Sequence, residues 1–167
     1  MDAPGHAPGR RARLIMFGVA AVVLAADEIS KSLVLAHLPR DGVRLLGGLI
    51  TLRLLLNPGA AFSVGTSYTA VIALIACAAV VFIVRTARRL RSTGWSVALG
   101  LVLGGALGNL ADRVFRSPGP LRGAVVDWIN LPHFPWTFNL ADAAITCGGV
   151  LIAVLALRGT RIEGPAG

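Results

Sequence analysis

Four apolar stretches divide this chain. Residues 14–38, 64–84, 95–111 and 138–157 are rich in leucine, valine and alanine and hold few charged residues. Each is close to the about 20 residues with which an α-helix crosses the roughly 30 Å hydrocarbon core of a bilayer. The pattern predicts an all-α integral membrane protein with four transmembrane helices.

The ends of the chain differ from this apolar body. Residues 1–13 combine Pro, Gly, His and Arg, and we expect a disordered basic tail. The first apolar stretch has the basic start of a signal peptide but no convincing cleavage site, and it continues through Asp27 and Lys31. We therefore expect a mature helix, a single membrane domain over residues 14–158 and a short tail over 159–167.

Two segments between the helices, residues 39–63 and 112–137, are not plain loops. Within residues 45–56, polar Thr51 and Arg53 alternate with apolar neighbours, which are Ile50, Leu52 and Leu54. Alternation with a period of two is typical of a strand with one polar face. The segment predicts a small β-cradle at the membrane surface.

Basic residues predict the orientation. Nine of them flank the first helix start, the link between helices two and three, and the end of helix four: Arg10, Arg11, Arg13, Arg85, Arg88, Arg89, Arg91, Arg158 and Arg161. Loops rich in Lys and Arg remain in the cytoplasm. We expect cytoplasmic termini and an extracytoplasmic cradle.

Composition excludes some classes of function. Of 167 residues, 55% are hydrophobic and only 14% charged, which is unusual for a soluble domain. The net charge of +8 lies beside apolar stretches and not among aromatics, so we expect no nucleic-acid partner. Cys77 and Cys147 lie in apolar helices and the histidines are scattered, so we expect no disulfide, metal or cofactor.

Polar residues of three helices fall at one depth. Helical rise places Asp27 about 20 Å, and Asn109 and Asp112 about 21–26 Å, from the cytoplasmic side, while Asp142 is about 6 Å below the outer end of helix four. One shared layer predicts a site near the outer leaflet. It differs from the polar path that a pore or proton channel would need.

Other intramembrane residues are expected to support this layer. Asp27 and Lys31 have the i, i+4 spacing and order of a helical ion pair. Asp112 and Arg113 form a second polar platform, and Asn109 shares a helical face with Asp112 and can orient it. The glycines of helix three predict close approach of another helix, and they are Gly100, Gly104 and Gly108.

Asp127 and Asp142 are the candidate catalytic pair. Two carboxylates within hydrogen-bonding reach do not both ionise easily, so one can activate water while the other donates a proton. The alternative is structural: Asp127 ends a strand, and Asp142 charges the start of helix four. Spacing alone leaves both interpretations open.

Five ordered motifs resemble those of the bacterial lipoprotein signal peptidases, also called signal peptidase II. They are D-x-x-[ST]-K at 27–31, N-x-G-A-A-F-S at 57–63, G-[GA]-A-x-G-N-x-x-D-R at 104–113, V-x-D-[FWY] at 125–128 and F-N-x-A-D-[SA] at 138–143. The chain departs from the family pattern in a longer interval between Arg113 and Asp127, and in Ala143 where Ser is common. Neither departure touches the two aspartates.

The resemblance implies a monomeric aspartic endopeptidase of the bacterial cytoplasmic membrane. It would cut diacylglyceryl-modified prolipoproteins before the lipidated cysteine, near the outer leaflet, and globomycin-type inhibitors would block it. Asp127 and Asp142 would be the catalytic dyad. Residues expected to bind substrate or hold the dyad are Asn57, Gly59, Asn109, Arg113, Asn139 and Ala141, and residues expected to be structural are Asp27, Lys31 and Asp112.

Two other functions deserve comparison. A Ser–Lys peptidase could use Lys31, but Ser30 and Ser32 are its helix neighbours and do not face it, so Ser63 would have to serve. A small transporter or channel would show inverted repeats and polar residues at the midplane. The chain shows neither feature.

Overall fold

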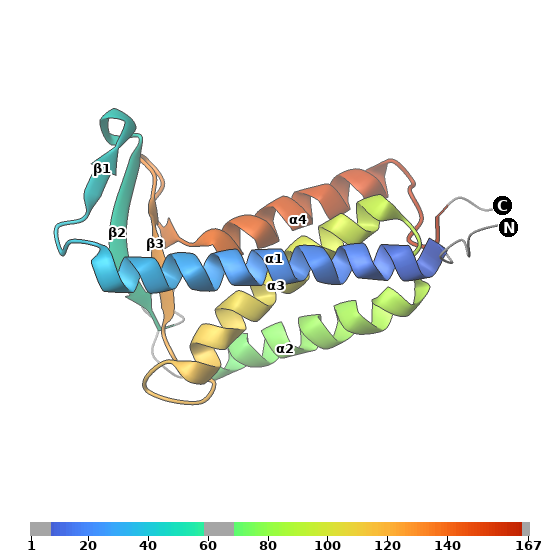
Figure 1. Ribbon diagram of the computed structural model, residues 1–167, viewed down its shortest axis with the longest axis horizontal. Helices are drawn as coiled ribbons and strands as arrows, with labels where there is room; N and C mark the ends of the chain where they lie inside the picture. Colours follow the sequence, from blue (N-terminus) through green and yellow to red (C-terminus); the bar gives the residue numbers. More distant parts are fainter. Residues whose placement is uncertain (1–7, 59–68, 165–167) are drawn as a thin grey trace, which may run out of the picture.

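The computed structural model describes residues 8–58 and 69–164, in which a helical bundle carries a small sheet at one end (Figure 1). The helices are α1 (Pro8–His37), α2 (Thr69–Thr86), α3 (Thr93–Phe115) and α4 (Leu140–Leu157). The strands are β1 (Val43–Leu45), β2 (Ile50–Asn57), β3 (Val125–Asn130) and β4 (Thr137–Phe138). They form one antiparallel sheet in the order β1-β2-β3-β4, so the predicted combination of helices and a small sheet is confirmed.

Three helical segments in the described part of the chain are long and apolar enough to cross a membrane. They are Thr69–Arg89, Thr93–Phe115 and Leu140–Leu157. The 30-residue α1 is not among them, and it carries Asp27, Glu28 and Lys31 in its second half. Length and composition therefore give three candidate spans where four were predicted.

Helix α3 lies at the centre of the bundle and contacts each of the other three helices. Its glycines permit this packing. A Cβ built on Gly100 would lie 2.7 Å from the Met16 carbonyl oxygen, and one on Gly104 would lie 2.7 Å from the Ala20 carbonyl oxygen, both in α1. The predicted close approach is confirmed, because only residues without a side chain fit there.

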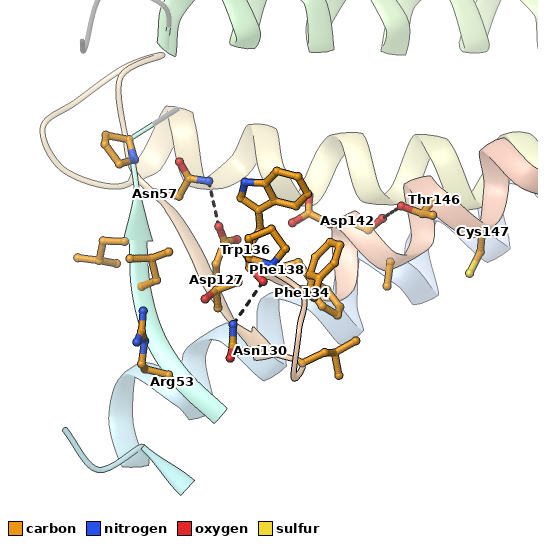
Figure 2. A pocket seen from close by; sticks show the side chains of 17 residues that line it. Arg53, Asn57, Asp127, Asn130, Phe134, Trp136, Phe138, Asp142, Thr146 and Cys147 are labelled. Atoms are coloured by element: carbon orange, nitrogen blue, oxygen red, sulfur yellow. Dashed lines mark hydrogen bonds between the residues drawn. The ribbon is translucent and has the colours of Figure 1, made fainter. Parts of the chain in front are cut away.

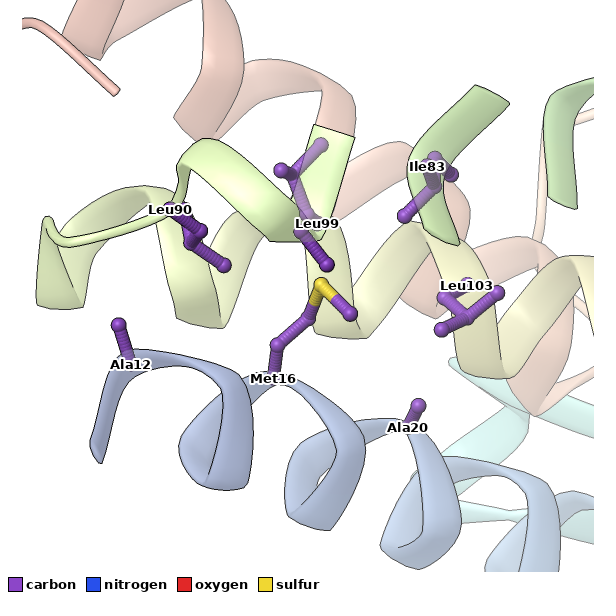
Figure 3. Packing of buried hydrophobic residues seen from close by; sticks show 8 residues of the cluster. Ala12, Met16, Ala20, Ile83, Leu90, Leu99 and Leu103 are labelled. Atoms are coloured by element: carbon purple, nitrogen blue, oxygen red, sulfur yellow. The ribbon is translucent and has the colours of Figure 1, made fainter. Parts of the chain in front are cut away.

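The apolar core, whose side chains are drawn in Figure 3, lies toward the end of the bundle away from the sheet (Figure 1). Met16 of α1 is fully buried against Leu99 and Leu103 of α3, and Ile83 of α2 and Leu90 complete the contact. The segment after α4 folds back onto this end. Its Ile162 carbonyl accepts hydrogen bonds from the Arg91 and Ser92 backbone amides, at 3.0 and 3.1 Å.

Within the described residues, two helix boundaries differ from the prediction by more than two residues. Helix α1 begins at Pro8, so residues 8–13 are helical and not part of a disordered tail; Ala12 packs into the apolar core, which stabilises this first turn. Helix α3 continues past residue 111 to Phe115. An ion pair between Asp112 and Arg116, one turn apart, supports the added turn.

Candidate active site

The sheet brings Asp127 to the start of α4, where Asp142 lies. Asp127 is in β3, opposite Leu55 of β2, and its side chain is almost completely buried at 1% exposure. Asp142 is in the first turn of α4 and is half-buried. Both carboxylates line the same pocket, which has a volume of about 650 Å³ (Figure 2).

Asn139 joins the two aspartates. Its amide nitrogen donates to Asp127 Oδ1 at 2.7 Å, and its backbone N–H donates to Asp142 Oδ2 at 3.3 Å. Its side-chain oxygen accepts the Asp142 backbone N–H at 2.9 Å, which completes a capping box at the start of α4. One buried asparagine therefore fixes both the helix start and the relative placement of the carboxylates.

Two further asparagines supply the remaining donors. Asn57, the last residue of β2, donates from Nδ2 to Asp127 Oδ2 at 3.0 Å. Asn109 of α3 donates from Nδ2 to Asp142 Oδ1 at 2.7 Å, and its oxygen accepts the Asn139 amide at 3.1 Å. All four carboxylate oxygens therefore accept a hydrogen bond from an N–H group.

A buried charged layer lies beneath this network. Lys31 is fully buried and its Nζ lies 2.6 Å from Asp27 Oδ2 and 2.8 Å from Asp112 Oδ2. The predicted Asp27–Lys31 ion pair is therefore present. Lys31 also donates to Asn109 Oδ1 at 3.4 Å, which connects the charged layer to the asparagine network.

Helix α4 is attached to this layer through its backbone. The Ala141 backbone N–H donates to Asp27 Oδ1 at 3.0 Å, and Ala141 is fully buried. A Cβ on Gly108 would lie 2.5 Å from Asp27 Oδ2 and 3.4 Å from the Ala141 Cβ. The absence of a side chain at Gly108 thus lets Asp27 reach α4.

The contacts of Asn109, Asp112 and Arg113 differ from the expected platform. Asp112 pairs with Lys31 and Arg116, and it accepts the Val126 backbone N–H at 3.1 Å, so it holds the start of β3. Arg113 does not pair with Asp112, and its Nη1 donates to the Asn109 carbonyl oxygen at 3.2 Å. Asn109 orients Asp142, not Asp112, because Lys31 lies between Asn109 and Asp112.

Two predicted positions lie outside the described residues. They are Gly59 and Ser63. Ser30, one of the two serines next to Lys31 in α1, donates its hydroxyl hydrogen to the Asp27 carbonyl oxygen at 2.8 Å. Its hydroxyl is thus bonded to the backbone of its own helix.

Burial raises the pKa of Asp127 from 3.8 to about 6, and the nearby Asp142 charge adds to this shift. Hydrogen bonds from Asn57 and Asn139, and the charge of Lys31, act in the opposite direction. A carboxyl group with a pKa near 6 can hold or release a proton close to neutral pH.

The pocket also contains residues that the sequence did not single out as functional. Phe134, Trp136 and Phe138 alternate just before α4 and line it, and the Phe134 ring stands edge-on to the other two, at centroid distances of 5.3 and 5.9 Å. The alternating aromatic residues before the Asp142 motif could have indicated these pocket-lining positions from the sequence. Arg53 also lines the pocket, and the polar face predicted for its strand was the signal there.

The described residues contain no group of three or more His, Cys, Asp or Glu side chains arranged to hold a metal ion. The donors to Asp127 and Asp142 are instead the N–H groups of three asparagines, namely three side-chain amides and one backbone amide. This arrangement stabilises negative charge on the carboxylates and leaves the pocket side open to water and substrate.

Comparison with solved structures gives the class of protein. A bacterial membrane enzyme determined by the in meso method has a TM-score of 0.75 with this chain and 26% sequence identity, and the match covers 87% of this chain and 94% of that chain. A second bacterial membrane enzyme solved by the same method has a TM-score of 0.74 at 24% identity. The fold is that of a membrane enzyme.

Sequence comparison gives the family. The family model for signal peptidase (SPase) II matches residues 19–158. The chain is 46% identical to a lipoprotein signal peptidase of Rhodococcus jostii, over 98% of this chain and 84% of the relative. The corresponding protein of Mycobacterium avium is 48% identical, over 94% of this chain and 86% of the relative. The chain belongs to the signal peptidase II family, and the resemblance predicted from the five motifs is confirmed.

Proposed function

We propose that this protein is an aspartic endopeptidase that removes the signal peptide from diacylglyceryl-modified prolipoproteins, cutting before the lipidated cysteine. Family membership supports the substrate class. The observation that carries the aspartic mechanism is the bridge between two pocket-lining carboxylates, in which Asn139 donates to both Asp127 and Asp142. A purely structural role for both residues would not need them to share a pocket.

The two aspartates divide the acid and base work in this proposal. Asp142, the more exposed, takes a proton from a water molecule, whose oxygen attacks the scissile carbonyl carbon. Asp127, whose pKa is raised to about 6 by burial, holds the proton that passes to the leaving amide nitrogen. The carbon–nitrogen bond breaks, and the products are the signal peptide with a new carboxylate and the lipoprotein with a free amino group.

The surrounding residues hold the dyad in this geometry. Asn57, Asn109 and Asn139 donate to the carboxylates, and Arg113 fixes the backbone of Asn109. Lys31 acts as structural support with Asp27 and Asp112. Gly59 and Ala141 complete the set that we assign to backbone contacts with the substrate or the dyad.

We also propose that α1 is a fourth transmembrane helix. Its 30 residues extend about 45 Å, enough to cross the hydrocarbon core. Its internal charges are neutralised, since Lys31 contacts both Asp27 and Asp112 and the Arg116 guanidinium lies 3.9 Å from Glu28. Both termini then lie in the cytoplasm, and the sheet and pocket lie at the outer leaflet of the bacterial cytoplasmic membrane.

The apolar part of the pocket is suited to a lipid-modified substrate. Phe134, Trp136, Ala143 and Cys147 line it, and the first two of these expose 42% and 49% of their surface. Such a surface can hold acyl chains while the peptide lies against the carboxylates. We expect globomycin-type inhibitors to compete for this pocket, and the protein to act as a monomer.

A cleavage assay on a diacylglyceryl-modified prolipoprotein tests the proposal. Wild type should release the signal peptide, whereas Asp127→Asn and Asp142→Asn should each reduce kcat by at least about 100-fold if each group transfers a proton. Asp41→Asn is the matched control, because Asp41 is exposed and does not line the pocket. Near-normal activity in either folded dyad variant would remove that residue from the mechanism.

A further inference from the structure

Arg53 occupies one end of the active-site pocket. It lies on β2, whose residues Arg53, Leu55 and Asn57 alternate along the strand and all line the pocket. The register of β2 against β3 shifts between Leu52 and Leu55, a type of irregularity that commonly redirects side chains beside active sites. Figure 2 shows Arg53 nearer the start of β2 than Asn57, away from Asp142 and α4.

The guanidinium of Arg53 has no anionic partner in the described part of the chain. Among the described residues it makes no ion pair and no side-chain hydrogen bond, and its side chain is exposed. The other charged residues lining the pocket are Asp127 and Asp142, which are already bonded to asparagines. Arg53 is therefore available to an anionic group that enters with the substrate.

Strand geometry gives the distance from the dyad to this group. Leu55 is the direct partner of Asp127 across the sheet, and Arg53 is two residues before Leu55 in β2, a distance of about 7 Å along the strand. An extended substrate peptide has about the same rise per residue, and the long side chain of Arg53 can contact more than one position along such a peptide. A side chain about two to four residues from the scissile bond therefore falls within contact distance.

We propose that Arg53 is a specificity residue that binds an acidic side chain in the first few residues after the lipidated cysteine of the prolipoprotein. This proposal rests on the peptidase function proposed above. The apolar and α4 side of the pocket, with Ala143 and Cys147, is suited to the lipid, whereas Arg53 lies at the other side, on the sheet (Figure 2). The diacylglyceryl group is uncharged, and a signal peptide consists of a basic start, an apolar stretch and small residues at the cleavage site. The mature peptide is therefore the part of the substrate that can supply an anionic side chain.

The test compares paired substrates in nanodiscs of neutral phosphatidylcholine. Each pair is a diacylglyceryl-modified prolipoprotein that carries Asp or Asn at one of the second to fourth positions, counting the cysteine as the first. Wild-type kcat/KM should be about two- to fivefold higher for Asp at the preferred position, the size expected for a partly exposed ion pair. Arg53→Gln should bring the Asp/Asn ratio to about one, and Arg53→Glu should bring it below one.

Arg44→Gln is the matched control. Arg44 is exposed on the neighbouring strand β1 and does not line the pocket, so this variant should retain the wild-type Asp/Asn ratio. The proposal is overturned if wild type shows no preference at any position, or if Arg53→Gln keeps the preference.

A second set of assays, with an anionic lipid added, distinguishes a phospholipid headgroup from a peptide carboxylate as the partner of Arg53. If Arg53→Gln lowers kcat/KM equally for Asp and Asn substrates, and only when phosphatidylglycerol is added to the nanodiscs, then Arg53 binds a phospholipid headgroup and the proposal is wrong. Cleavage of the Asn substrates by the wild-type protein tests the proposed peptidase function independently of any charge preference. Its absence overturns both proposals, whereas cleavage without a charge preference overturns only the role of Arg53.

Discussion

Replacement of Lys31 by Met should destabilise the protein strongly. Lys31 is fully buried between Asp27 and Asp112, at 2.6 and 2.8 Å, and both carboxylates are also buried. Methionine fills a similar volume, so packing changes little, but Asp27 loses its positive partner. Removal of one member of a buried ion pair typically costs about 3–5 kcal/mol, because the remaining charge is left without compensation.

Thermal unfolding in detergent micelles measures this cost. A loss of that size lowers the Tm of a protein this long by about 10 °C. Addition of Asp27→Asn to Lys31→Met should recover part of the stability, since it removes the uncompensated charge. The double variant should therefore be more stable than the sum of the single effects by about 1 kcal/mol or more.

The control is Arg44→Met, which removes an exposed cation from β1 and should change stability by about 0.5 kcal/mol or less. Equal effects of Lys31→Met and Arg44→Met, or strict additivity in the double variant, would refute the charged layer as a stabilising unit.

The pH dependence of activity gives a second test of the same variant. The Lys31 charge lowers the pKa of Asp127, so the alkaline limb of the pH–rate profile should move to higher pH in Lys31→Met.

Three further results are expected. The pKa of Asp127 is raised from 3.8 to about 6, so the native state holds this proton more tightly than the unfolded chain and loses stability as the pH rises through that range. The stability of wild type minus that of Asp127→Asn should therefore fall by about 3 kcal/mol between pH about 3.5 and about 8, and a pH-independent difference would contradict the shift. Gly148→Ala should lower the free energy of unfolding by about 1–3 kcal/mol, because the added Cβ would lie 2.7 Å from Val102 Cγ2. Gly149→Ala, where the added Cβ meets open space, should be neutral or stabilising, and comparing the unfolding of these two variants tests the packing argument directly. Asn139→Asp keeps the oxygen that caps α4 but removes the donor to Asp127, so kcat should fall about 10-fold or more while the helix start is retained; unchanged kcat would show that the donor is dispensable.

Much of the fold could be predicted because membrane-like helices have a strong sequence signal. The runs around residues 69–86 and 140–157 are almost wholly apolar, and the alternation at Thr51 and Arg53 indicated the strand that is β2. Helical rise also placed Asp27 and Asp112 at a common depth, and the structure joins them through Lys31. These features depend on local periodicity, which the sequence displays directly.

The partners of individual polar groups could not be predicted in the same way. Asn109 was expected to serve Asp112, but Lys31 of α1 enters between them and Asn109 turns to Asp142. The start of α1 was also missed, since its composition is polar and its helical state depends on the burial of Ala12 in the apolar core. Such contacts depend on how separate helices pack, which no single segment specifies.

The three asparagine amides have a common polarity. Asn57, Asn109 and Asn139 each point an N–H at a carboxylate, and the oxygens of the last two accept from Lys31 or a backbone N–H. They form an array of N–H donors directed at the two acids before any substrate arrives. Because the array is built into the fold, little reorganisation is needed when charge moves between carboxylates and substrate. The electric field at the two carboxylates is therefore fixed by the packing that orients the three amides. A substitution that turned one amide around, so that its oxygen faced the carboxylate, would reverse that amide's contribution to the field, even if both carboxylates stayed in place.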